Sequence, residues 1–205
     1  MSMDPNAAVP ETPAARSPVE LIKENSRQLR GGLADELAQN TDHFNDQDKQ
    51  LIKFHGSYQQ DNRDARKDRH RVGSGKAYMF MVRCKIPGGK VTAPQYLAID
   101  LIAEKYANGT LRITSRQGFQ LHGILKSNLK LAIADINQSL LTTLGACGDV
   151  NRNVMAPISP LSSPVYLELQ KQADLLAAHF APRSGAYHEI WLNGKQLPSP
   201  PTPLP

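Results

Sequence analysis

The chain has 205 residues, enough for one domain with a sizeable core, and its 24 lysines and arginines against 19 acidic residues give a net charge of +5. This mild excess is consistent with an anionic partner but does not indicate nucleic acid in particular. No apolar run is long enough to span a bilayer, and the N-terminus lacks the regions of a secretory signal, so we expect a cytoplasmic protein. The two cysteines, Cys84 and Cys147, suit a reducing compartment and provide no complete thiolate set for a metal.

Proline-rich sequence marks both ends of the chain. Residues 1–18 hold four prolines with little apolar periodicity, and residues 197–205 read LPSPPTPLP. Neither stretch can pack a core, so we expect both to be disordered. The final run follows a segment that otherwise looks folded, so we expect a truncated gene product or a fragment.

The first third of the chain predicts an arm followed by a polar loop, over residues 19–71. Residues 19–38 have helical periodicity that Gly31 and Gly32 break into two pieces. A short apolar strand over 50–54 then leads into a polar segment, in which His55 is expected to be partly buried. The charged run 63–71 is expected to be solvated.

The next elements predict a buried strand and a helix. Residues 77–86 are nearly all apolar, as in a central strand, apart from Arg83. A helix is expected from Pro94 to about Tyr106, with Leu97, Leu101 and Ile102 facing the core.

Polar and apolar residues then alternate through a predicted hairpin, with strands at 111–115 and 119–123. Side chains two apart share a face of a strand, so Arg112, Thr114 and Arg116 join Gln120 and His122 on one face. Leu111, Ile113, Phe119 and Leu121 form the other. A solvated outer face is the plain alternative to a binding surface.

Two further helices are predicted, over 129–144 and 164–180, before a final strand and turn at 187–194. The order strand, helix, hairpin, helix is that of a split βαβ unit. The fold class is therefore α+β, a ferredoxin-like half domain over residues 72–155. Both helices should cover one face of its antiparallel sheet and leave the polar face free. His179 and His188 are expected to be structural or exposed.

Two more arginines belong to the candidate binding surface. A guanidinium in a buried strand is costly without a partner, so Arg83 must meet a carboxylate or an anionic ligand. Arg152 lies between Asn151 and Asn153, after small residues that allow close backbone approach. Planar guanidiniums suit flat polyanions, although the Asn-Arg-Asn sequence is also compatible with a simple turn.

The chain closely resembles the N-terminal part of assimilatory sulfite reductase hemoproteins, in the sirohaem and iron–sulfur family of nitrite and sulfite reductases. The resemblance runs from about Leu21 to Gly194. Five segments carry it: FHGSYQQ (54–60), RCKIPGG (83–89), LRITSRQ (111–117), FQLHG (119–123) and DVNRNV (149–154). The GSYQQ form resembles the ferredoxin-dependent branch more than the NADPH-linked one.

The resemblance implies six-electron reduction of sulfite to sulfide at sirohaem, in sulfur assimilation, with ferredoxin as donor and a [4Fe–4S] cluster. It implies that Arg83 and Arg152 surround the bound anion and act in catalysis. It also implies that Arg112, Thr114, Arg116, Gln120, His122 and Asn151 hold the macrocycle. Residues 156–196 would begin the sirohaem-binding domain.

The sequence departs from this family pattern in what it lacks. The family holds its cluster with Cys-x5-Cys and Cys-x3-Cys motifs, and neither occurs here, nor does the family's pair of active-site lysines. We therefore expect an incomplete catalyst that needs the missing C-terminal half. A nitrite reductase fragment stays open as an alternative. An RNA-binding ferredoxin-like module is disfavoured because the cationic face offers no aromatic residue for base stacking.

Overall fold

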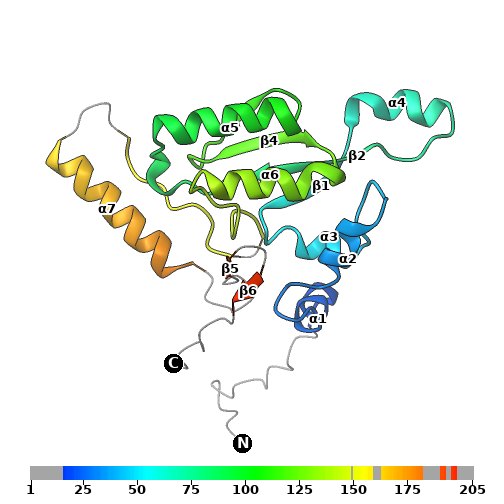
Figure 1. Ribbon diagram of the computed structural model, residues 1–205, viewed down its shortest axis with the longest axis horizontal. Coiled ribbons are helices and arrows are strands. Elements are labelled where there is room, and N and C mark those ends of the chain that lie inside the picture. Colours follow the sequence, from blue (N-terminus) through cyan, green and yellow to red (C-terminus); the bar gives the residue numbers. More distant parts are fainter. Residues whose placement is uncertain (1–15, 149, 159–162, 182–189, 193–194, 198–205) are drawn as a thin grey trace, which may run out of the picture.

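The computed structural model describes residues 16–148, 150–158, 163–181, 190–192 and 195–197. A four-stranded antiparallel sheet with the strand order β1-β2-β4-β3 organises the chain (Figure 1). Its strands are β1 (Ser57–Asp61), β2 (Tyr78–Arg83), β3 (Leu111–Ile113) and β4 (Phe119–Ile124). The longer helices are α4 (Arg63–Arg71), α5 (Ala93–Tyr106), α6 (Lys126–Gln138) and α7 (Pro164–His179). The short elements are α1 (Pro18–Glu24), α2 (Leu33–Ala38), α3 (Asp48–Leu51), η1 (Pro87–Gly89), β5 (Ile190–Leu192) and β6 (Lys195–Leu197).

The predicted hairpin is confirmed. Strands β3 and β4 pair antiparallel, with Arg112 opposite Gln120 and Leu111 opposite Leu121. Gln120 is also opposite Arg83 of β2, so these three polar side chains emerge on the same face of adjacent strands. The connecting turn places Gln117 at φ 56° and ends on Gly118, close to where the sequence predicts it.

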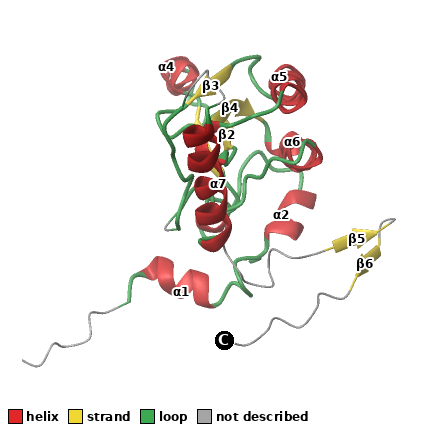
Figure 2. Cartoon of the chain, turned by 90° about the vertical axis from the view of Figure 1, so that its left-hand side faces the viewer, coloured by secondary structure: helices red, strands yellow, loops and turns green. Residues whose placement is uncertain are grey.

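The elements β2, α5, β3, β4 and α6 form the predicted split βαβ arrangement. Helices α5 and α6 pack against each other and cover the same face of the sheet (Figure 2). The outer position beside β2, which a strand after α6 would take, is filled by β1 from earlier in the chain. Strand β1 therefore completes the sheet although it precedes residue 72.

The core lies between the sheet and the two helices. Apolar residues of β2 and β4 alternate inward and meet α5 and α6 in a cluster that includes Phe80, Val82, Ile99, Ile102, Leu121, Ile124, Leu129 and Ile136. Helix α5 starts with a capping box between Thr92 and Gln95 and has proline in its first turn. Its boundaries match the prediction.

Two details of the predicted helices are wrong. Leu97 and Leu101 are 58% and 64% exposed, because Ile99, Ile102 and Ala103 are the α5 side chains that reach the core. Helix α6 begins at Lys126 and ends at Gln138, whereas the periodicity predicted residues 129–144. Leu140 adopts φ 63° and is 88% exposed, so the chain has already left the helix there.

The N-terminal segment forms the two expected helical pieces, α1 and α2. The strand predicted at 50–54 is wrong: α3 and a turn occupy it, and extended structure starts at Ser57. The charged run at 63–71 is exposed as expected, but it is the helix α4, inserted between β1 and β2. His55 is half-buried, and its Nε2 lies 3.3 Å from the carbonyl oxygen of Leu29.

The predicted disordered ends fall mostly outside the described residues, as do residues 187–189 and 193–194 of the last predicted strand. The described residues of these two ends are ordered, contrary to the prediction: Ser17 caps α1, which starts at Pro18, and Leu197 is the last residue of β6. Helix α7 forms where expected and lies against η1. Within the described residues, no helix has the length and apolar character needed to cross a membrane.

Candidate anion-binding site

A cleft of about 470 Å³ opens on the polar side of the sheet, away from α5 and α6. The four arginines singled out from the sequence all line it: Arg83, Arg112, Arg116 and Arg152. They come from β2, from β3, from the β3–β4 turn and from the segment after Gly148. Thr114, Gln120 and Asn153 also line the cleft.

Arg83 is held in place by uncharged acceptors. With its amide oriented to accept, the Gln120 oxygen lies 2.9 Å from Nε and 2.5 Å from Nη2 of Arg83. Nη1 donates to the carbonyl oxygen of Ala146 at 3.4 Å. Arg83 is only half-buried, a glutamine and a backbone carbonyl accept its hydrogen bonds, and its positive charge stays uncompensated within the described residues.

The segment 142–153 reaches the sheet through backbone contacts that small residues permit. Gly56 adopts φ 79°, and a Cβ there would lie 2.2 Å from the carbonyl oxygen of Thr143. The Lys85 amide donates to the Thr142 carbonyl at 2.7 Å, and the Gly145 amide donates to Phe54 at 2.9 Å. These contacts bring Ala146 beneath Arg83 and carry the chain on toward Arg152.

Asn153 fixes the far wall of the cleft. Its side chain is buried, and its Oδ1 accepts from the Ile86 amide at 2.8 Å. Its Nδ2 donates to the carbonyls of Ile86 at 2.6 Å and Arg116 at 2.8 Å. One amide therefore ties the end of the β2 segment to the β3–β4 turn, next to two of the arginines.

Of the remaining predicted site residues, Thr114 lines the cleft, whereas His122 and Asn151 do not. Thr114 accepts from the Gly118 amide at 3.1 Å and so stabilises the turn that presents Arg116. His122 lies on the same strand face as Gln120 but does not line the cleft. Asn151 is exposed, and only its backbone carbonyl is engaged, by Lys85 Nζ at 3.4 Å. The structure therefore brings Arg112, Arg116, Gln120 and Thr114 together with Arg83 and Arg152, and leaves His122 and Asn151 outside the cleft lining.

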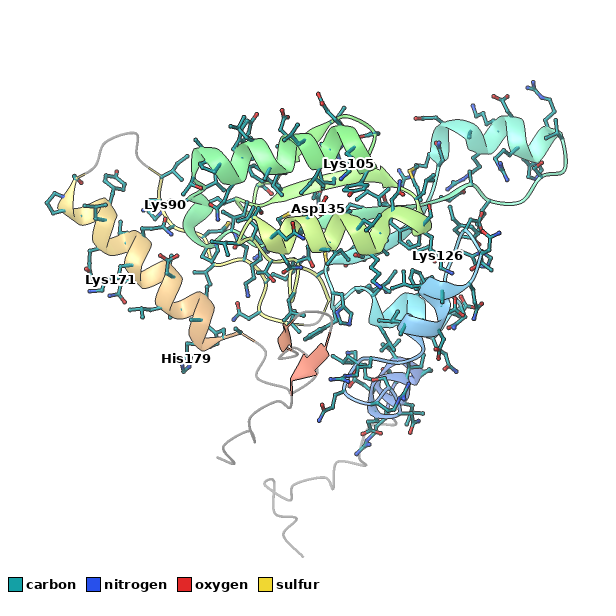
Figure 3. All side chains as sticks on the ribbon, in the orientation of Figure 1. Lys90, Lys105, Lys126, Asp135, Lys171 and His179 are labelled. Atoms are coloured by element: carbon teal, nitrogen blue, oxygen red, sulfur yellow. The ribbon has the colours of Figure 1, made fainter. Side chains whose placement is uncertain are left out.

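No ion pair to any of the four arginines is found within the described ranges. A larger cleft of about 640 Å³, between α5 and α6, provides the contrast. There Lys105 Nζ lies 3.5 Å from Asp135 Oδ2, and the two are seen together in Figure 3. Glu104 also lines that cleft, which therefore has two carboxylates and one lysine, so the arginine cleft is the better candidate for an anion.

A buried polar atom near the cleft also fits an anionic ligand. In the part of the chain that the structure describes, His122 Nε2 is buried without a hydrogen-bond partner. Ser57 Oγ is also buried without one, but Ser57 pairs with Val82 and so lies on the core face of the sheet. Burial lowers the pKa of His122, and the charges of Arg112 and Arg83 lower it further. The ring is therefore neutral at neutral pH and can donate one hydrogen bond. The four arginines and His122 fit a large polyanionic group such as sirohaem on this face.

Sequence reasoning missed two groups that belong to the site's surroundings. Lys85 is 6% exposed, and burial lowers its pKa. Burial also raises the pKa values of Tyr58 and Cys147, and the nearby Arg83 and Arg152 oppose that rise. Alternation along the strand could have placed Lys85 on the Arg83 face. Tyr58 and Cys147 share a side-chain hydrogen bond, and no sequence signal predicts that contact.

The cysteines do not form a metal site. Cys84 and Cys147 are both buried, and burial raises the pKa of the Cys84 thiol to about 12. Among the described residues, no group of three or more histidine, cysteine or carboxylate side chains is arranged to hold a metal ion.

Comparison with known proteins follows the same lines. Residues 72–139 match the family described as the nitrite/sulfite reductase ferredoxin-like half domain. The protein named sulfite reductase [NADPH] hemoprotein beta-component from Staphylococcus saprophyticus is 51% identical over 180 residues, or 87% of this chain and 32% of that protein. Its namesake from Geobacillus thermodenitrificans is 50% identical over 186 residues, or 90% of this chain and 32% of that protein. This chain thus spans about a third of the length of these relatives.

A solved structure supports the fold. The NirA protein of Mycobacterium tuberculosis superposes with a TM-score of 0.61 at 22% sequence identity, covering 79% of this chain and 31% of that one. The relatives above are named for NADPH, so they do not support the expected likeness to the ferredoxin-dependent branch. The half-domain match and the identity of about one half over most of the chain confirm the resemblance. Residues 72–139 belong to the nitrite/sulfite reductase ferredoxin-like half-domain family, and most of the chain is similar to one third of sulfite reductase hemoproteins.

Proposed function

We propose that this chain supplies the anion-binding sheet face of an enzyme that reduces sulfite to sulfide in six electrons, in sulfur assimilation. The observation that carries the proposal is the cleft lined by four arginines, with no ion-pair partner among the described residues. Cations fixed in this way favour an anion at their centre, and proteins of which this chain matches a third are named sulfite reductase hemoproteins.

Arg83 and Arg152 take the role of holding the sulfite oxygens. Arg83 is fixed by Gln120 and Ala146, so its guanidinium is oriented before an anion arrives. Fixed donors of this kind stabilise negative charge on oxygen and weaken the S–O bonds as electrons and protons are added. Arg112, Arg116, Thr114, Gln120 and His122 would hold the carboxylates and edge of sirohaem, and Asn151 would join them only if its exposed side chain turns inward.

Sirohaem, with a [4Fe–4S] cluster in the rest of the enzyme, would supply the electrons that reach the sulfur atom. The protein contributes positive charge to this site. The negative charge of the eight sirohaem carboxylates and the sulfite anion exceeds the positive charge of the four guanidiniums in the cleft. Cations other than these four guanidiniums would therefore be needed to balance the charge of the bound groups. This agrees with a chain that spans about a third of its relatives.

The domain division is part of the proposal. The half domain would span residues 72–155 and be joined by β1, with residues 156–196 opening the sirohaem-binding domain and 19–71 serving as an arm. The cytoplasm, with its reducing conditions, is the proposed location because both cysteines are unpaired thiols. The electron donor is proposed to be an NADPH-oxidising component, as the relatives' names suggest, and ferredoxin is the alternative.

A chimera tests the function. This chain would replace the matching third of the Staphylococcus saprophyticus hemoprotein, and sulfide would be measured with a reduced viologen as donor. We expect sulfide from sulfite, a loss of at least about tenfold in kcat/KM for Arg83→Ala and for Arg152→Ala, and no change for the exposed Lys130→Ala. Haem absorbance of each variant checks that the cofactor is loaded. A loaded chimera that makes no sulfide would contradict the proposal.

Nitrite is the second candidate substrate, because the matching family is described for both nitrite and sulfite reductases. The same chimera decides between them through the ratio of kcat/KM for nitrite and sulfite. A ratio above one would assign the chain to nitrite reduction.

A further inference from the structure

Helix α4 forms an arm that stands off from the sheet (Figure 1). It is inserted between β1 and β2, and among the described residues it packs against no other helix. Its sequence RDARKDRHR contains five arginines and lysines and two aspartates in nine residues. No α4 residue lines the arginine cleft, because α4 adjoins the start of β2 whereas Arg83 lies at the end of that strand.

The charges of α4 are segregated around the helix. With 3.6 residues per turn, the basic side chains of Arg63, Arg66, Lys67, Arg69, His70 and Arg71 cover an arc of about 200° without an acidic interruption. Asp64 and Asp68 lie together along one edge of that arc. A merely solvated helix has no need of such an arrangement, since mixed charges serve solubility as well.

Residues on one side of the arc hold the arm rigid. Arg66 Nε donates to Asp61 at 2.7 Å, and Asp61 also accepts from the Ala77 amide at 3.2 Å. Arg69 donates to the carbonyls of Gly75 at 2.8 Å and Lys76 at 3.4 Å. Asn62 caps the helix by accepting from the amides of Asp64 and Ala65. The arm is thus tied to the end of β1 and to the segment that leads into β2.

The other side of the arc is left for contact with a partner. Arg63, Lys67, His70 and Arg71 are exposed, and Arg63 and Lys67 make no hydrogen bond or ion pair that the described residues reveal. Arg71 approaches Asp68 only to 3.9 Å, with both side chains 82% exposed, a pair of little strength. We call these four residues the basic face of α4.

We propose that the basic face of α4 docks an acidic protein surface and, resting on the proposed function, that this surface belongs to the component that delivers electrons. A rigid cationic face raises the rate of encounter with an acidic partner, and the aspartate edge fixes the register in which it docks. The helix has no large apolar side chain to insert into a membrane. Its aspartate edge would repel a phosphate backbone.

Fluorescence anisotropy tests the docking surface on the chain as it is. The probes are labelled poly-L-glutamate, a labelled DNA duplex, phosphatidylserine vesicles and the NADPH-oxidising component of the Staphylococcus saprophyticus enzyme. The test variant is Arg63→Glu with Lys67→Glu, and the matched control is Lys90→Glu with Lys130→Glu, which changes the net charge equally at exposed positions elsewhere (Lys90 is labelled in Figure 3). Circular dichroism and thermal melts confirm that each variant is folded.

We expect poly-L-glutamate to bind at low ionic strength and the test variant to lose about tenfold in affinity, with the control within about twofold. Equal losses of affinity in both variants would show that binding depends on net charge alone and would overturn the proposal. Tighter, α4-dependent binding of DNA or vesicles would overturn it in favour of those partners. Poly-L-glutamate binding without binding of the NADPH-oxidising component would overturn the donor assignment. None of these outcomes depends on sulfite reduction, which the chimera tests separately.

Discussion

A single buried amide, that of Asn153, connects three parts of the cleft, and its removal should be costly. Asn153→Ala leaves the Ile86 amide and the Ile86 and Arg116 carbonyls without their partner. We expect a loss of about 3 kcal/mol in the free energy of unfolding, measured by urea denaturation. The exposed Asn151 provides the control, since Asn151→Ala should change the free energy of unfolding by less than about 0.5 kcal/mol. Equal effects would show that Asn153 is not the tie between these segments.

The arginine cleft should bind small dianions in the isolated chain. Sulfate at ten times its dissociation constant should stabilise the fold by about 1.4 kcal/mol, or about 4 °C in Tm. Arg83→Ala should lose most of the shift, whereas Lys130→Ala should keep it. Sodium chloride of equal ionic strength controls for screening, and the part of the sulfate effect that acts by exclusion from the surface is common to both variants. The same shift in both would rule out a specific site.

Two ion pairs of equal length should differ widely in their contribution to stability. Lys126 Nζ lies 3.5 Å from Glu36 with both side chains largely buried, and Lys105 lies 3.5 Å from Asp135 in a more exposed setting. Lys126 also donates to the His43 carbonyl at 2.8 Å, which pins the 41–44 segment to α6. Lys126→Met should therefore cost about 3 kcal/mol and Lys105→Met less than about 1 kcal/mol, by urea denaturation.

The Lys126 pair also carries a pH dependence. The hydrogen bond from Asn45 lowers the pKa of Glu36 below 4.5, and Lys126 adds to that lowering. A carboxyl group with a depressed pKa stabilises the fold above its unfolded pKa and loses that stability as the pH falls through the folded value. The wild-type chain should thus lose part of its stability below about pH 4.5, and Lys126→Met should lose less over the same range. Parallel curves would contradict this assignment.

At the scale of elements, α7 shows what periodicity leaves open. The sequence gives it apolar residues at helical spacing, yet Leu167, Leu175 and Phe180 are about half exposed, and only Ala173 and Ala177 are buried. Spacing predicts a face but does not say what covers it.

Substitution on α7 should therefore have little effect on this chain. Leu175→Ser should change the free energy of unfolding by less than about 0.5 kcal/mol, whereas Leu129→Ala in α6, whose side chain is 3% exposed, should cost about 3 kcal/mol. Urea denaturation of the two variants measures both. A large loss for Leu175→Ser would mean that α7 packs against this chain in solution.

At the scale of the whole molecule, the chain alone should assemble no iron–sulfur cluster. Four thiolates are needed, and the two cysteines are buried, one with its pKa raised to about 12. After anaerobic reconstitution with iron and sulfide we expect no cluster absorbance, and no sulfide from sulfite above a no-protein control. Cluster absorbance that survives Cys84→Ser would show that iron is bound elsewhere, and its loss in that variant would show the core thiol to be reachable.

Much of the half domain was predictable from sequence, because its signals are local. Alternation over residues 111–123 predicts the hairpin and the shared face of Arg112 and Gln120, and Pro94 in a first helical turn predicts α5. The strand expected at 50–54 failed because a short apolar run fits a buried helical turn equally well. Leu97 and Leu101 were misplaced because α5 carries apolar residues around most of its circumference.

The convergence of the four arginines was predictable only in part. Strand alternation links Arg112 to Gln120, but the pairing of β2 with β4, which adds Arg83, is a tertiary fact. Arg152 is positioned by the hydrogen bonds of the neighbouring Asn153 side chain and by the close approach of the Thr143 backbone to Gly56. Neither contact has a sequence signature. The functions assigned to these residues stay predictions.

Arg83, Lys85 and Ile86 contact Ala146, Asn151 and Asn153, which lie 63 to 67 residues further along the chain, and this separation sets an order of events during synthesis. Loops of that length close late, because their entropy is lost before any contact repays it. The ribosome releases the chain from its N-terminus, so the sheet, α5 and α6 can form before Asn153 has emerged. Arg152 therefore joins Arg83, Arg112 and Arg116 only after the sheet and its two helices have folded, so the full repulsion between the four arginines acts on a scaffold that is already stable.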